Sequence, residues 1–118
     1  MFDKVTETNL LYDFYAQLLT GRQREVTRLY HCENLSLAEI GAELSISRQG
    51  VHDALKSAEK ALAEYERILG LVRRFEYAAG LVKDANAGLD TLIKGNETNK
   101  ELTDKLYDLK RIVEELGQ

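Results

Sequence analysis

The chain has 118 residues, a net charge of -4 and 44% hydrophobic residues, which is too much apolar content for a disordered protein. Its one cysteine, Cys32, excludes an internal disulfide and favours a reducing, cytoplasmic compartment. The first ten residues have neither the basic cluster nor the apolar core of a signal peptide, and no apolar run reaches membrane-spanning length.

Hydrophobic residues recur at helical spacing along the chain, and the absence of proline agrees with an all-α fold. A first helix is predicted from about Thr8 to Leu19. Thr20 then has the position of an N-cap, and Gln23 three residues later completes a capping box. A second helix is therefore predicted from Thr20 to about His31.

The next segment has the pattern of a helix-turn-helix. Ser36 and Glu39 form a second capping box, which opens a helix whose predicted buried residues are Leu37, Ile40 and Leu44. Ser47 caps the following helix, whose predicted buried residues are Val51, Leu55, Ala58 and Leu62. Ile46, in the short connection between them, is predicted to fix the angle between the two helices.

The C-terminal segment is predicted to be a helical hairpin. The helix that Ser47 caps is expected either to continue past Gly70 or to break near it. In the segment that follows, apolar residues recur at steps of four and three, namely Leu71, Phe75, Ala78, Val82, Ala85, Leu89 and Leu92. A shifted seam fits almost as well, and its residues are Val72, Phe75, Ala79, Val82, Asn86, Leu89 and Ile93. Residues 94–99 form the predicted loop, and Thr98 is the predicted cap of a last helix with a seam of Leu102, Leu106, Leu109, Val113 and Leu116.

These apolar seams can close within one chain or between two chains. Because helix-turn-helix proteins often pair to address two half-sites, we expect a homodimer. The expected interface residues are Leu71, Phe75, Val82, Leu89, Leu102, Leu106, Leu109 and Val113. The sequence thus predicts a helix-turn-helix domain over residues 1–67, with its core at 36–62, and a dimerisation or bundle segment over 68–118.

The stretch from Ser36 to Leu62 resembles the DNA-reading half of bacterial sigma-factor region 4. Together with LLYDFYAQLLTGRQ and KSAEKALAEYE, it is similar in order and spacing to the YlxM-like family of small bacterial helix-turn-helix proteins. This resemblance covers residues 8 to about 76 and implies a sigma region-4-like bundle in a regulatory protein. The gene neighbourhood of that family implies a link to the signal recognition particle, with components of that particle as partners.

A helix-turn-helix that enters a major groove contacts DNA through the first turns of its second helix. Arg48 and Gln49 are the predicted base-reading residues, because arginine pairs with guanine and glutamine with adenine. His52 and Lys56 follow on the same face, and Ser47 is a predicted phosphate contact at the helix N-terminus. The preceding helix supplies predicted backbone contacts at Arg22, Arg24 and Arg28.

Charge argues against a strongly basic footprint. Residues 20–67 contain seven Lys or Arg residues and eight Asp or Glu residues, and Asp53 lies beside the predicted reading face. DNA-binding domains usually carry a basic excess, since phosphate contacts supply much of their affinity. Two hypotheses therefore stay open. The first is a regulator that binds DNA, and the second is an accessory protein that contacts RNA or protein of the signal recognition particle.

No catalytic constellation is visible in the sequence. The serines occupy cap positions, and the sequence contains no Gly-rich phosphate loop or nucleophile elbow. His31 and Cys32 are adjacent, but two ligands are too few for a zinc site, so neither a metal nor another cofactor is expected. The sequence predicts a protein that is not an enzyme.

Overall fold

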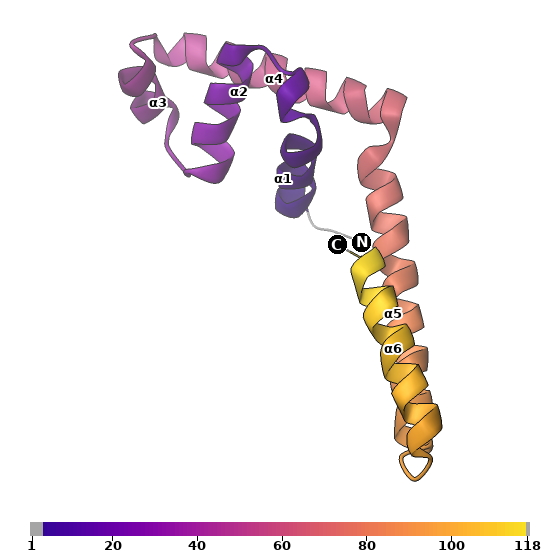
Figure 1. The fold of residues 1–118 in the computed structure, drawn as a ribbon. Helices are drawn as coiled ribbons and strands as arrows, with labels where there is room; N and C mark the ends of the chain where they lie inside the picture. Colours follow the sequence, from indigo (N-terminus) through magenta and orange to yellow (C-terminus); the bar gives the residue numbers. More distant parts are fainter. Residues whose placement is uncertain (1–3, 118) are drawn as a thin grey trace. The chain divides into compact units, whose positions relative to one another are not determined.

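The computed structural model describes residues 4–117, which form α-helices and short helical turns without any β-strand, and this confirms the all-α prediction (Figure 1). The chain divides into two compact units, Met1–Val72 and Arg73–Gln118. The sequence places this boundary slightly earlier, after residue 67. The first unit contains the helix-turn-helix and the second contains a helical hairpin.

Over residues 4–72 the first unit contains four complete α-helices, and α1, α2 and α3 pack beside the long helix α4 (Figure 1). Its elements in chain order are α1 (Lys4–Tyr15), a 3-10 turn (Ala16–Leu18), α2 (Gly21–Thr27), a π-helical turn (Arg28–Cys32), α3 (Leu37–Leu44) and α4 (Arg48–Leu69).

The C-terminal ends of the first two helices differ from the prediction. The α-helical part of the first ends at Tyr15 rather than Leu19, because Leu19 is extended and the backbone between them tightens into the 3-10 turn. The second helix does reach the region of His31, but it does so through a π turn in which Glu33 N–H donates to the Arg28 carbonyl. Irregular turns of this kind have no simple periodic signature.

The predicted N-caps of the first unit are confirmed. Thr20 Oγ1 accepts from Gln23 N at 3.2 Å, and Gln23 Oε1 accepts from Thr20 N at 3.0 Å. Ser36 and Glu39 exchange the equivalent pair of bonds at 3.1 and 3.0 Å. Each box satisfies two backbone donors that the first turn of a helix otherwise leaves unpaired.

The corner between α3 and α4 is tight. Ser45 ends α3 in the left-handed conformation, with φ of 57°, and Ile46 N–H donates to the Gly41 carbonyl at 2.9 Å. A Cβ atom on Gly41 would lie 2.8 Å from the Ile46 carbonyl oxygen, so only glycine fits at this crossing. The Ile46 side chain is half-buried and packs against the core, which agrees with its predicted role in the turn.

Two hydrophobic clusters lie along α4. The first joins α2, α3 and the N-terminal half of α4, and its buried residues are Val26, Leu29, Ile40, Val51 and Leu55. The second joins α1 to the C-terminal half of α4 and to Val72, and its buried residues are Tyr15, Leu19, Leu62 and Val72. The four α4 positions predicted to be buried, Val51, Leu55, Ala58 and Leu62, are all buried.

Helix α4 ends at Gly70, whose φ of 64° is the left-handed conformation that a glycine adopts without strain. A polar cluster holds the chain just beyond this point. Tyr15 Oη donates to Glu66 Oε1 at 2.6 Å and accepts from Leu71 N at 3.0 Å. Glu66 Oε1 also accepts from Val72 N at 2.9 Å, so these two side chains satisfy the first amides of the next helix.

The second unit is an antiparallel hairpin of α5 (Leu71–Gly95, whose first two residues belong to the first unit) and α6 (Lys100–Leu116) (Figure 1). The prediction of Thr98 as the cap of the last helix is wrong, because Asn99 Oδ1 accepts from Leu102 N instead. Both residue types cap helices well, so composition alone does not choose between neighbours. Lys110 Nζ bridges the two helices to Asp90 Oδ1 at 2.7 Å.

The hairpin uses the shifted seam of α5. Ile93 is buried, and Phe75, Ala79, Val82, Asn86 and Leu89 are half-buried. On α6 the positions turned inward are Thr103, Leu106, Lys110 and Val113. Leu102, Leu109 and Leu116 are exposed, although they belong to the seam expected from the sequence. The hairpin thus buries one of its two apolar sides and leaves the other exposed to solvent.

Candidate nucleic-acid interface

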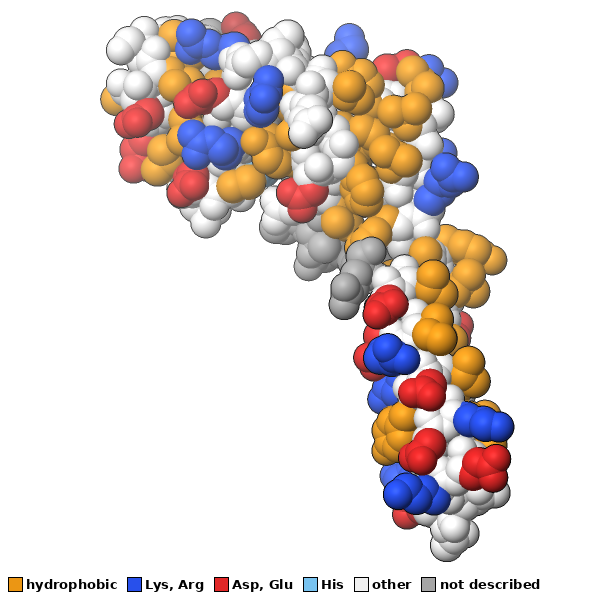
Figure 2. Space-filling view, viewed as in Figure 1, with side chains coloured by type: hydrophobic (Ala, Val, Ile, Leu, Met, Phe, Trp, Pro, Cys, Tyr) orange, Lys and Arg blue, Asp and Glu red, His pale blue; other side chains and the backbone are white. Residues whose placement is uncertain are grey.

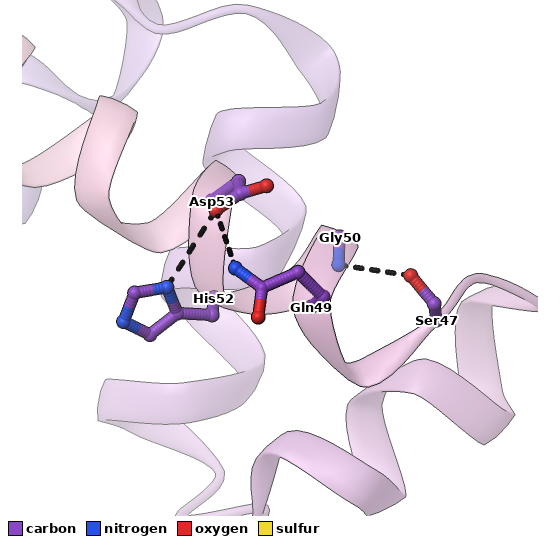
Figure 3. Close-up of polar contacts among 5 residues, drawn as sticks. All are labelled: Ser47, Gln49, Gly50, His52 and Asp53. Atoms are coloured by element: carbon purple, nitrogen blue, oxygen red, sulfur yellow. Dashed lines mark hydrogen bonds and ion pairs between the residues drawn. The ribbon is translucent and has the colours of Figure 1, made fainter.

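The start of α4 carries the predicted reading residues. Ser47 Oγ accepts from Gly50 N at 3.0 Å, which fixes the first turn of the helix (Figure 3). Arg48, Gln49, His52 and Lys56 are all exposed, and their spacing places them on one side of α4. That side flanks the buried stripe that begins with Val51, and Leu55 of the stripe borders the surface near Lys56.

Two adjoining hollows lie along this side of α4. Arg48, Gln49 and His52 line the first together with Leu37 from the first turn of α3. His52 and Lys56 line the second, together with Tyr30, Leu37, Leu55 and Glu59. Since Leu37 and His52 belong to both hollows, the four predicted reading residues border one continuous surface, which we call the reading face.

Asp53 engages two residues of the reading face. Gln49 Nε2 donates to Asp53 Oδ1 at 2.9 Å, and His52 Nδ1 lies 3.6 Å from the same oxygen (Figure 3). These contacts orient the two side chains along the helix surface. The carboxylate also adds negative charge beside the place where a phosphate would approach, so it opposes anion binding.

The predicted backbone contacts Arg22 and Arg24 on α2 and Arg28 in the π turn do not line the hollows of the reading face. Burial raises the pKa of the Tyr12 hydroxyl above 10.0 and Cys32 raises it further, while the charges of Arg28 and Arg24 oppose the rise. The π turn that begins with Arg28 contacts α1. Arg28 also lies within 3.5 Å of Glu25 and 3.6 Å of Glu33, so acidic neighbours already balance its charge. Arg22 is exposed at the beginning of α2.

The sequence interpretation did not identify three residues that border the reading face. Leu37 was expected to be buried, but it is half-buried and forms the wall shared by the hollows. Tyr30 and Glu59 border the second hollow. Glu59 lies seven residues after His52, a spacing that returns to the same side of a helix and could have placed it there. Tyr30 comes from the π turn, which has no simple periodic signature.

One further contact ties the reading helix to α2. Gln23 Nε2 donates to Ser57 Oγ at 2.8 Å, while its Oε1 completes the capping box of α2. A single side chain thereby fixes both the start of the supporting helix and its position against α4. The reading face consequently stands on a scaffold held by hydrogen bonds as well as by the apolar core.

His31 and Cys32 gain no partners that would complete a metal site. Within the described residues, no group of three or more potential ligands comes together. His31 Nε2 lies 3.9 Å from Glu59 Oε1, and its ring packs edge-on against Tyr30 with centroids 4.9 Å apart. None of the helices over residues 4–117 combines the length and apolar character that crossing a membrane requires.

Comparison with known proteins agrees with this architecture. Residues 2–106 match the UPF0122 family, described as "Putative helix-turn-helix protein, YlxM / p13 like". The UPF0122 protein of Thermoanaerobacter sp. strain X514 is 40% identical over 117 residues, which cover 99% of each chain. The UPF0122 protein of Listeria innocua is 37% identical over 112 residues, which cover 95% of this chain and 99% of the relative. On this evidence the chain belongs to the UPF0122 family of YlxM/p13-like proteins.

Proposed function

We propose that this protein is a non-catalytic regulator that binds double-stranded DNA by inserting the first turns of α4 into the major groove. The observation that supports this most directly is the common side of α4 shared by Arg48, Gln49, His52 and Lys56. This side begins at the N-terminus of α4, directly after the tight α3–α4 corner. A major groove accepts one helix presented in this way.

The proposal assigns different roles to these side chains. Arg48 is suited to a bidentate contact with guanine, because its guanidinium is exposed in the first turn of α4. Lys56 lies two turns further along and is suited to a phosphate contact. Gln49 can read adenine after it exchanges its bond with Asp53 for a bond to the base. The expected cytoplasmic location agrees with this function.

Binding of a random-sequence duplex library, followed by anisotropy measurements on the selected sequences, tests the proposal. Replacing both Arg48 and Lys56 with alanine is expected to weaken binding at least tenfold, since a bidentate base contact contributes about 1–3 kcal/mol. The slope of log affinity against log salt is expected to fall by about one for the lost phosphate contact.

A matched control removes two charges from the hairpin. Lys83 and Arg111 are exposed there, so their double alanine variant has the same net charge as the test variant. Its DNA affinity is expected to stay close to that of the wild type. Equal loss in both variants would mean that binding follows total charge, and unchanged affinity in the test variant would refute the assigned reading face.

The near-neutral charge of residues 20–67 favours one alternative, in which the same scaffold contacts components of the signal recognition particle. The binding assay separates these possibilities when the RNA of that particle replaces the duplex as the probe. Binding to that RNA with no selected duplex would support the alternative and exclude the DNA proposal. Selection of a defined duplex sequence would support DNA reading.

A further inference from the structure

The hairpin of α5 and α6 exposes large apolar side chains on one side. We call this side the outer face and define it by Leu81, Leu92, Leu102, Leu109, Ile112 and Leu116. These six side chains are between 37% and 72% exposed. Hydrophobic side chains stand exposed at the edges of the hairpin in Figure 2, beside a strip on which acidic and basic groups alternate.

The spacing of these residues places them on a common side of each helix. In α5, Leu81, Ala85, Gly88 and Leu92 follow at steps of four, three and four, directly beside the buried seam. In α6, Leu102, Leu109 and Leu116 repeat every seven residues. A single groove is lined by residues from both rows, including Ala85, Gly88, Leu92 and Leu109, so the rows of the two helices adjoin.

The opposite flank of the hairpin carries several charged groups. Asp90 and Lys110 form their ion pair there, and Lys83 and Arg111 fall on the same flank by helical spacing. The hairpin is therefore amphipathic as a whole, although its two helices already bury one seam against each other. Helices with two adjacent apolar seams are typical of bundles with more than two members.

The core of the isolated hairpin is small. Among its described residues only Ile93, Thr103 and Leu106 are buried, and one of these is polar. Burial of so few side chains offsets only a small part of the free-energy cost of ordering two helices. Additional helices packed on the outer face would supply the missing core.

We propose that a second copy of this chain covers the outer face, so that two hairpins form a symmetric four-helix bundle. The face is suited to a copy of itself, because leucine rows border a trough at Ala85 and Gly88. Nothing lies within 4 Å of where a Cβ atom on Gly88 would stand, so the trough has room for side chains of a partner. An interface with twofold symmetry brings the ridges of each copy to the trough of the other.

The apolar area is sufficient for this association. The six side chains of the outer face expose on the order of 500 Å² on each hairpin, which is comparable to the largest apolar patch of a typical monomer, and such patches are often functional. A symmetric pair would bury about twice that area, which reaches the roughly 1,000 Å² expected of a specific interface. This interface differs from the expected one, since Val82 and Leu106 are turned inward within the hairpin.

Analytical ultracentrifugation of the full chain at high micromolar concentration tests the proposal without any nucleic acid. The wild type is expected to sediment as a species of twice 13.4 kDa. Leu109→Asp and Ile112→Asp are each expected to produce monomers with unchanged helical circular dichroism, because both side chains are already half-exposed in the single chain.

Tyr107→Asp is the matched control. Tyr107 lies on the other flank of α6 and is 57% exposed, compared with 51% for Leu109. This variant is expected to remain a dimer. A monomeric wild type, a dimer that survives both outer-face substitutions, or equal disruption by Tyr107→Asp would each overturn the proposal. None of these results depends on whether the reading face binds DNA.

Discussion

Tyr15 and Glu66 lie 51 residues apart in sequence and are joined by a 2.6 Å hydrogen bond from the tyrosine hydroxyl to the carboxylate. The Tyr15 side chain is fully buried. Both groups also accept bonds from the first amides of α5, so one contact fastens α1, the end of α4 and the start of α5. The arrangement places a carboxylate at a helix N-terminus, where the helix dipole favours negative charge.

Tyr15→Phe is expected to lower the free energy of unfolding by about 1.5–3 kcal/mol, the range for a hydrogen bond to a charged group. The substitution removes the hydroxyl that serves both Glu66 and the Leu71 amide, while it keeps the aromatic ring in the core. Urea denaturation followed by circular dichroism measures the change. Tyr77→Phe, at a site that is 71% exposed, is the control and should leave stability nearly unchanged.

Gly41→Ala is expected to destabilise the helix-turn-helix by about 1–3 kcal/mol, as other overpacked substitutions do. The new Cβ atom would lie 2.8 Å from the Ile46 carbonyl, which belongs to the backbone and cannot rotate away. Gly80→Ala is the matched comparison, because nothing lies within 4 Å of its Cβ position. It should raise stability by up to about 1 kcal/mol through better helix propensity. Equal stability of the two variants would contradict the assigned corner geometry.

Asp53→Asn is expected to increase affinity for duplex DNA several-fold, if α4 reads DNA as proposed. The asparagine keeps the size of the side chain and an oxygen that can accept from Gln49, so the charge is the main change. The gain should shrink as salt rises, because screening weakens the repulsion that the substitution removes. Asp104→Asn on α6 serves as the control, and an equal gain there would show a general effect of charge.

The stabilisation that Glu39 gives to the N-terminal cap of α3 should be lost in acid. The Ser36 backbone N–H, with help from the Ser36 side chain, lowers the pKa of Glu39 below 4.5. Since the folded pKa lies below the unfolded value, the contribution is present above pH 4.5 and is lost as pH falls through the folded pKa. Titration by NMR should locate this lowered pKa directly. Glu39→Gln should flatten the decline of stability in this pH range, and an unchanged decline would count against the cap.

Local features of the fold could be predicted from the sequence. The boxes at Thr20 and Ser36 and the cap at Ser47 depend only on residues within one turn, so short-range spacing identifies them. The same holds for the buried stripe of α4, which repeats at helical spacing over about three turns. Exposure of the four reading-face side chains follows from that stripe, since none of them belongs to it.

Other features of the fold could not be predicted from local sequence. Helix α5 has two adjacent apolar seams, and periodicity cannot tell which one faces α6. Thr98 and Asn99 are both good caps, so the exact start of α6 depends on the geometry of the loop. The bond from Gln49 to Asp53 has a spacing that is visible in the sequence, but the side-chain conformation that forms it is not.

The π turn at Arg28–Cys32 accommodates more residues per turn than a regular helix of the same rise. A relative that lacks one residue in this stretch can close the turn as an ordinary α-helix and still bring its next helix to the same place. Length variation among related chains should therefore be tolerated between Arg28 and Cys32. A deletion between Gly41 and Ser47 should not be tolerated, since it would disrupt the tight connection between α3 and α4.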